Sequence, residues 1–162
     1  MKKYSKIKRF EVKSNCIKDG GKIENIEIQS KALKEDIDNP KQWLLLIVAY
    51  YYAEDNKNTY KWAVKAIKRF PEEESIYVYV GDICRNLKKY DEALKYWNKA
   101  LELDNAYLDV KYSIGFCYEE MGDYEKAYTA WKELEDELGR RELTVDKELP
   151  LQLAKNCKNK RF

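Results

Sequence analysis

The chain has 162 residues, of which 44% are hydrophobic and 37% are charged, and its formal net charge is +2. This composition supports one domain with a substantial core and excludes an intrinsically disordered chain. The charge balance does not indicate nucleic-acid binding, and only 6 Gly and 3 Pro disfavour an all-β fold with its frequent tight turns.

The chain lacks His entirely. This removes the usual general base, the commonest zinc ligand and every Ser-His or Cys-His catalytic pair. The glycine pair Gly20-Gly21 is not followed by the Lys-Ser/Thr of a phosphate-binding loop, and the four cysteines are too scattered for a CxxC motif. The sequence therefore predicts no enzyme activity, no cofactor and no metal site.

The four cysteines include no close pair and the chain size does not demand disulfides, which fits a reducing compartment. Together with the lack of a secretory signal, this predicts a cytoplasmic protein. The longest apolar stretch, residues 44–52, is far shorter than the roughly 20 residues of a membrane span.

Residues 1–20 form a basic arm with no clean hydrophobic period, which predicts an extended or disordered segment. Residues 1–18 contain seven Lys or Arg residues and only one acidic residue, Glu11. The apolar residues of the arm are Ile7, Phe10, Val12 and Ile17. The basic ends favour solvated termini over contact with phosphates or membranes.

Residues 21–39 are predicted to form an N-terminal capping helix, running from about Lys22 to Asp38. Ile23, Ile26, Leu33 and Ile37 recur at helical spacing along one face. Asp38-Asn39-Pro40 then ends the helix.

Residues 40–141 contain a repeat with a 34-residue period. Gly81, Ala93 and Trp97 return as Gly115, Ala127 and Trp131, all at the same offset (115 − 81 = 34). The period divides this region into three repeats, 40–73, 74–107 and 108–141. Pro71, Asn105 and Gly139 share one phase and are expected to end the second helix of each repeat.

Each repeat is predicted to contain two helices that approach closely at small residues, Gly115 and Ala127 in the third repeat. Gly122-Asp123 is expected to turn the chain between them, because Gly accepts a positive φ and Asp can cap the next helix. In the first repeat Ala63 stands where a large aromatic is expected, which indicates a rearranged interior. Residues 142–162 are expected to form a C-terminal capping helix, with Pro150 in its first turn, and a basic tail.

These residues resemble the tetratricopeptide repeat family. Ile114-Gly115, Tyr118, Ala127 and Trp131 match its L-G-x-x-Y … A-x-x-x-F pattern. The resemblance implies an all-α, right-handed superhelical solenoid of three helix-turn-helix units with a capping helix at each end.

In this family the first helix of each repeat lines a concave groove. The resemblance therefore implies a groove with an apolar and aromatic surface and a polar rim, formed by Leu44, Val48, Tyr51, Tyr52, Val78, Asp82, Arg85, Asn86, Tyr112, Phe116 and Glu119. Exposed aromatic and Arg side chains are the usual hot spots of binding.

The predicted function is that of a non-enzymatic adaptor that binds a peptide or helix with apolar anchors from a partner protein. Two alternatives stay open: a bacterial secretion-type chaperone and a self-assembling, homodimeric module. Residues 1–20, the C-terminal helix or a second copy of the chain could also occupy the groove.

Overall fold

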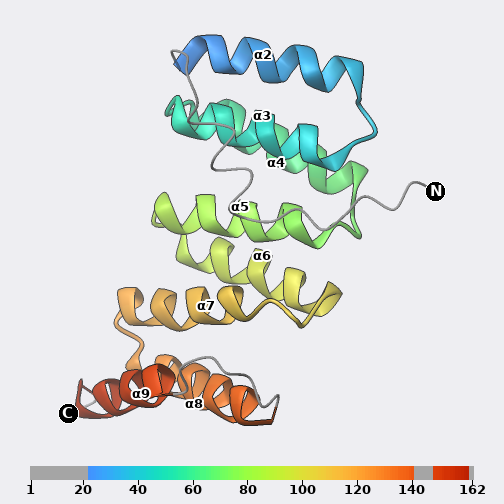
Figure 1. Ribbon diagram of the computed structural model, residues 1–162. Helices are drawn as coiled ribbons and strands as arrows, with labels where there is room; N and C mark the ends of the chain where they lie inside the picture. The colour runs from blue at the N-terminus through green and yellow to red at the C-terminus, as the bar shows by residue number, and fades with distance from the viewer. Residues whose placement is uncertain (1–21, 141–147, 161–162) are drawn as a thin grey trace. The chain divides into compact units, whose positions relative to one another are not determined.

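The computed structural model describes residues 22–140 and 148–160, and all regular secondary structure in these ranges is helical (Figure 1). The prediction of an all-α fold is therefore confirmed. The helices are α2 (Lys22–Glu35), α3 (Pro40–Tyr52), α4 (Asn56–Arg69), α5 (Glu74–Asn86), α6 (Tyr90–Leu103), α7 (Leu108–Met121), α8 (Tyr124–Arg140) and α9 (Glu148–Lys160). The basic arm predicted at residues 1–20 lies outside the described residues.

The helices keep the 34-residue period of the sequence. The first helices of the three repeats begin at Pro40, Glu74 and Leu108, and the second helices begin at Asn56, Tyr90 and Tyr124. The backbone contacts divide the chain into an N-terminal unit, residues 1–83, and a C-terminal unit, residues 84–162, with the boundary inside α5.

Side-chain caps define where the helices of the N-terminal unit begin. Asn39 Oδ1 accepts a hydrogen bond of 3.0 Å from the Lys41 amide, and Pro40 occupies the first turn of α3. Asp55 Oδ1 caps α4 in the same way, accepting from the Asn58 amide at 3.0 Å. Both caps satisfy amide groups that have no partner inside the helix.

The predicted end of α2 was wrong by a few residues. The helix ends at Glu35, before the expected Asp38, and Ile37 is 50% exposed instead of lying on the buried face. The reason is local: the Asn39 amide donates to Asp36 O in a turn, and Asn39 adopts the extended backbone favoured before Pro40.

Aromatic packing joins α3 to α4 in the N-terminal unit. The ring centroid of Trp43 lies 5.6 Å from that of Trp62 and 5.9 Å from that of Phe70. Trp43 Nε1 donates a hydrogen bond of 2.8 Å to Ile37 O. The rearranged interior expected for the first repeat is thus explained: Ala63 is small, and the neighbouring Trp62 supplies the ring that packs against Trp43.

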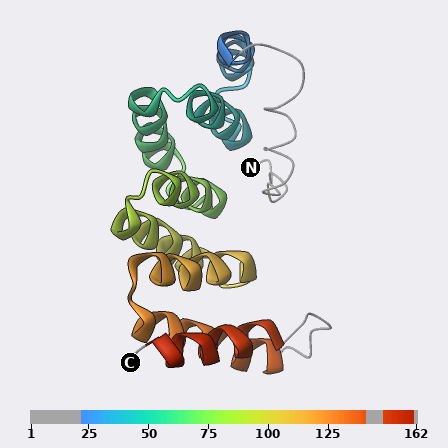
Figure 2. The same cartoon turned by 90° about the vertical axis from the view of Figure 1, so that its left-hand side faces the viewer.

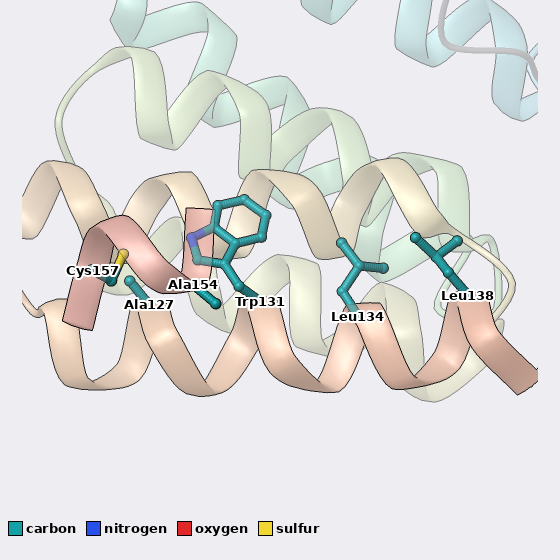
Figure 3. Packing of buried hydrophobic residues seen from close by; sticks show 6 residues of the cluster. All are labelled: Ala127, Trp131, Leu134, Leu138, Ala154 and Cys157. Carbon is teal, nitrogen blue, oxygen red and sulfur yellow. The ribbon is translucent and has the colours of Figure 1, made fainter. Parts of the chain in front are cut away.

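The core of the C-terminal unit lies between α7, α8 and α9 (Figure 3). α9 packs along α8 (Figure 2). The buried residues of this cluster are Ala127, Trp131, Leu134, Leu138, Ala154 and Cys157. As predicted, Gly122 adopts a positive φ of 75° at the end of α7, and Asp123 Oδ1 accepts from the Lys126 amide at 3.2 Å at the start of α8.

The prediction that Gly139 ends the last helix of the repeats was wrong. α8 continues through Gly139 to Arg140, whereas Pro71 and Asn105 do lie between helices. Leu134 and Leu138 are 1% and 0% exposed in the cluster with α9. Burial of this face stabilises another helical turn and outweighs the roughly 1 kcal/mol that Gly costs in a helix.

Candidate binding surface

The residues predicted to bind a partner lie on three helices of the fold. Leu44, Val48, Tyr51 and Tyr52 belong to α3, and Val78, Asp82, Arg85 and Asn86 belong to α5. Tyr112, Phe116 and Glu119 belong to α7. The division of the chain places the first six in the N-terminal unit and the other five in the C-terminal unit.

Most apolar candidates of the N-terminal unit are covered. Leu44, Val48 and Val78 are 0%, 4% and 2% exposed. Tyr51 and Tyr52 are half-buried, with their ring centroids 5.5 Å apart in an edge-to-face arrangement. Asp82 is also half-buried. The aliphatic side chains of this group therefore present almost no surface in the structure.

In the C-terminal unit, two aromatic residues of α7 pack against the buried Trp131 and form an aromatic pair. Tyr112 and Phe116 lie one turn apart on α7, and their ring centroids are 6.0 Å and 4.9 Å from the ring of Trp131. Phe116 is 37% exposed, while Trp131 beneath it is completely buried. The Phe116 ring packs edge-to-face against the Trp131 ring, with an angle of 73° between the two planes.

An ion pair borders this aromatic pair. The Arg85 guanidinium binds the Glu120 carboxylate through two nitrogen–oxygen contacts, of which Nε to Oε2 measures 3.3 Å. The side chains are 31% and 40% exposed, so the pair contributes at most about 1 kcal/mol to stability. Glu120 lies one helical turn after Phe116 on α7, and Asn86 next to Arg85 is exposed.

Glu119 is bound within its own unit. Its Oε1 accepts a hydrogen bond of 3.0 Å from Trp131 Nε1 and one of 3.5 Å from Cys157 Sγ. Lys160 Nζ lies 3.9 Å from Oε2. The carboxylate thus joins α7, α8 and α9. The sequence carried no signal for its contacts with Cys157 and Lys160, because α9 lies outside the 34-residue period.

The cysteines of the C-terminal unit have the character of packing residues. Cys84, Cys117 and Cys157 are free and buried. Burial raises the pKa of each thiol to about 11, with a further contribution from a nearby carboxylate: Glu92, Glu120 and Glu119 in turn. At neutral pH the thiolate that reacts with electrophiles is scarce.

A separate pocket of about 590 Å³ lies between α6, α7 and α8. Its lining mixes aliphatic side chains with charges of both signs, including Lys111, Glu133, Glu137 and Arg140. Lys111 and Glu137 form an ion pair there, with side chains 18% and 13% exposed. None of the candidate residues lines this pocket.

Residues 22–140 and 148–160 contain neither a metal-binding cluster nor a helix that could span a membrane. No three His, Cys, Asp or Glu side chains in these ranges gather closely enough to hold a metal ion. Among the helices described, none combines the length and the apolar character needed to cross a lipid bilayer.

The chain is similar in sequence to proteins that contain TPR repeats. Residues 81–122 match a family model described as TPR repeat. A relative from Methanocaldococcus jannaschii, TPR repeat-containing protein MJ1428, is 26% identical in an alignment covering 67% of this chain. The chain spans only about 25% of the length of that relative.

Solved structures of MamA share the fold. The structure titled MamA AMB-1 has a TM-score of 0.57 and 26% identity, with 78% of this chain and 67% of that chain covered. MamA MSR-1 gives a TM-score of 0.62 at 25% identity, covering 76% of this chain and 71% of that one. Another MamA structure has a TM-score of 0.64 at 21% identity. The alignment covers 84% of this chain and 73% of that chain.

Proposed function

Because this chain is a tetratricopeptide repeat protein, a fold that generally serves interaction between proteins, we propose that it is a non-enzymatic adaptor whose first helices bind a segment of another protein. The observation that carries the proposal is the exposed Phe116 held against the buried Trp131. The proposed partner is a peptide or helix with an apolar anchor, and the cytoplasm, where free thiols persist, is the proposed compartment.

The aromatic pair has the properties of a binding hot spot. Phe116 and Tyr112 supply large rings, and their contact with Trp131 restricts their motion in the free protein. A partner that buries Phe116 therefore gains apolar contact without having to order that side chain first. The neighbouring Arg85–Glu120 pair offers a donor and an acceptor for polar groups that flank the anchor.

The experiment selects peptides from a displayed random library on the purified protein and measures the Kd of a synthetic peptide for several variants. We expect Phe116→Ala to weaken binding at least about tenfold, which corresponds to the loss of one hot-spot side chain. Met121→Ala is the matched control, because Met121 is equally exposed, at 38%, and lies on another side of α7.

Equal affinity of the wild type and Phe116→Ala for the selected peptides would contradict the proposal. The same samples are examined by light scattering at several protein concentrations. A dimer that dissociates in Phe116→Asp would assign the aromatic pair to self-association instead of an external partner. Circular dichroism of each variant establishes that the helices remain intact.

A further inference from the structure

The second helix of the first repeat has a basic face. α4 contains five basic residues and no acidic residue. Four of its lysines lie within about 80° of one another around the helix and span about 17 Å along it, because successive residues turn by about 100° and rise by about 1.5 Å. All four are exposed: Lys57, Lys61, Lys65 and Lys68. We call these residues the basic face of α4.

The positions that lie two repeat periods later, on α8, have acidic side chains in place of three of the four lysines. They are Glu125, Thr129, Glu133 and Asp136, and all are exposed. We call these residues the acidic face of α8. Because they have the same spacing as the lysines of α4, the two faces have the same length and the same width around the helix. Their charges are therefore complementary position by position.

Helix α6, in the middle repeat, carries both signs at the same positions. In chain order these exposed residues are Asp91, Lys95, Lys99 and Glu102. Lys99 forms an ion pair with Glu102 on the same helix. An ion pair of this kind cannot form within α4, because α4 has no acidic residue. A face of a single sign is thus a property of particular repeats and not of the repeat pattern.

The lysines of α8 do not neutralise its acidic face. Lys126 is bound to Asp123 and Lys132 to Glu135, each three residues away along the chain. These two ammonium groups are therefore already paired with carboxylates outside the acidic face.

The reversal of charge continues at the next position of the pattern. Glu72 follows α4 at the phase that Arg140 occupies at the end of α8, and both residues are exposed. Here the first repeat has the negative charge and the third repeat has the positive one. The complementary pattern therefore extends one turn beyond the two faces, and it matches only when the two helices run in the same direction.

We propose that the basic face of α4 in one copy of this protein binds the acidic face of α8 in a second copy, with the two helices parallel. The facing residues are then Lys57 and Glu125, Lys61 and Thr129, Lys65 and Glu133, and Lys68 and Asp136. Because the two faces differ, a pair of copies keeps one unused face of each kind. The contact can therefore repeat from copy to copy.

The association is expected to be weak and dependent on salt. Exposed ion pairs are individually weak, whereas several aligned pairs steer and orient the two partners. The Debye length falls from about 30 Å at 0.01 M salt to about 3 Å at 1 M, so high salt should abolish the contact. The proposal does not depend on the proposed function, because the two faces lie on second helices whereas Phe116 lies on α7, a first helix.

The test is sedimentation velocity at several protein concentrations, in about 0.01 M and about 1 M salt. We expect the wild type to associate at low salt and to be monomeric at high salt. Lys61→Glu with Lys65→Glu should weaken the association at least about tenfold at low salt. The matched control is Lys95→Glu with Lys99→Glu on α6, at the same positions of the period and with the same change of net charge. The control should associate like the wild type.

A reversal on the other face completes the test. Glu133→Lys with Asp136→Lys should also weaken the association at least about tenfold at low salt. A mixture of the α4 variant and the α8 variant should associate again, because each face then finds one of opposite sign on the other variant. Such a rescue would also show that both variants are folded.

Several results would overturn the proposal. A wild type that is monomeric at low salt at every concentration would mean that the faces do not bind each other. If this monomer bound RNA or anionic vesicles and the α4 variant did not, the basic face would belong to an external polyanion. Equal association of the α4 variant and the wild type, or a mixture that stays monomeric, would place the contact elsewhere. The association should persist in Phe116→Asp, which separates this outcome from that of the proposed function.

Discussion

The indole of Trp131 lies directly against Gly115, so that a Cβ atom at residue 115 would be 2.6 Å from Cζ2 and Cη2 of the ring. Trp131 is 0% exposed and belongs to the core cluster of the C-terminal unit. The close approach of α7 and α8 therefore depends on the missing side chain at residue 115.

Gly115→Ala should destabilise the protein by about 1–3 kcal/mol, because the ring of the buried Trp131 would have to shift to admit the added Cβ. The free energy of unfolding is measured by urea titration. Gly139→Ala is the matched control: it is also a Gly-to-Ala change within a helix, but no atom lies within 4 Å of the added Cβ. The control should be neutral or stabilising by up to about 1 kcal/mol. Equal effects at the two positions would refute the steric argument.

Glu119→Ala should lower stability by about 1–3 kcal/mol, since it leaves the buried Trp131 Nε1 without its acceptor. It also removes the contacts of Cys157 and Lys160 with α7. Urea titration again gives the free energy of unfolding. Glu120→Ala serves for comparison, because its ion pair with Arg85 is partly exposed to solvent and should be worth at most about 1 kcal/mol. A larger loss for Glu120→Ala than for Glu119→Ala would show that the assignment is mistaken.

Gly122→Ala should cost about 1–2 kcal/mol through the backbone alone, because Gly122 has a φ of 75° and no atom within 4 Å of an added Cβ. Gly122→Asn should cost less, since Asn tolerates the left-handed region better than Ala. Thermal unfolding of the three proteins provides the comparison. If Ala and Asn were equally tolerated, residue 122 would not be held in this conformation.

Stability should decline as the pH rises above about 9. Burial raises the pKa of Cys157 from 9.0 to about 11 in the folded protein, so folding favours the protonated thiol. This contribution is fully present below pH 9 and is lost as the pH rises towards 11. Unfolding free energies at about pH 8 and about pH 10 measure the decline, and Cys157→Ala should reduce it. An unchanged pH dependence in Cys157→Ala would show that the thiol does not contribute.

Local pattern was sufficient to predict most of the fold. The 34-residue period placed the starts of the first helices, and Gly122-Asp123 identified a turn through conformational preferences that operate within a few residues. Gly139 was misjudged because Leu138 is buried in a cluster that also contains residues of α9, and this burial favours a helix that continues past a residue that usually ends one. Ile37 was misjudged because a turn before Pro40 ended α2 early.

The candidate surface could be predicted less well from the sequence than the fold could. Periodicity assigned Val48 and Phe116 to one phase, but only the structure shows that Val48 is 4% exposed and Phe116 is 37% exposed. The contacts of Glu119 could not be predicted from the repeat pattern either. Its partners Cys157 and Lys160 lie on α9, beyond the last repeat and far along the chain from α7.

The sequence by itself determined the helices, their period and the small residues where they meet, because these depend on propensity, spacing and steric size within one repeat. Only the tertiary structure decided which positions of equal phase are covered and which are exposed. The exposure of a side chain depends on which other parts of the chain pack over it. The repeat pattern assigns the same phase to residues in different repeats and does not specify what packs over each of them.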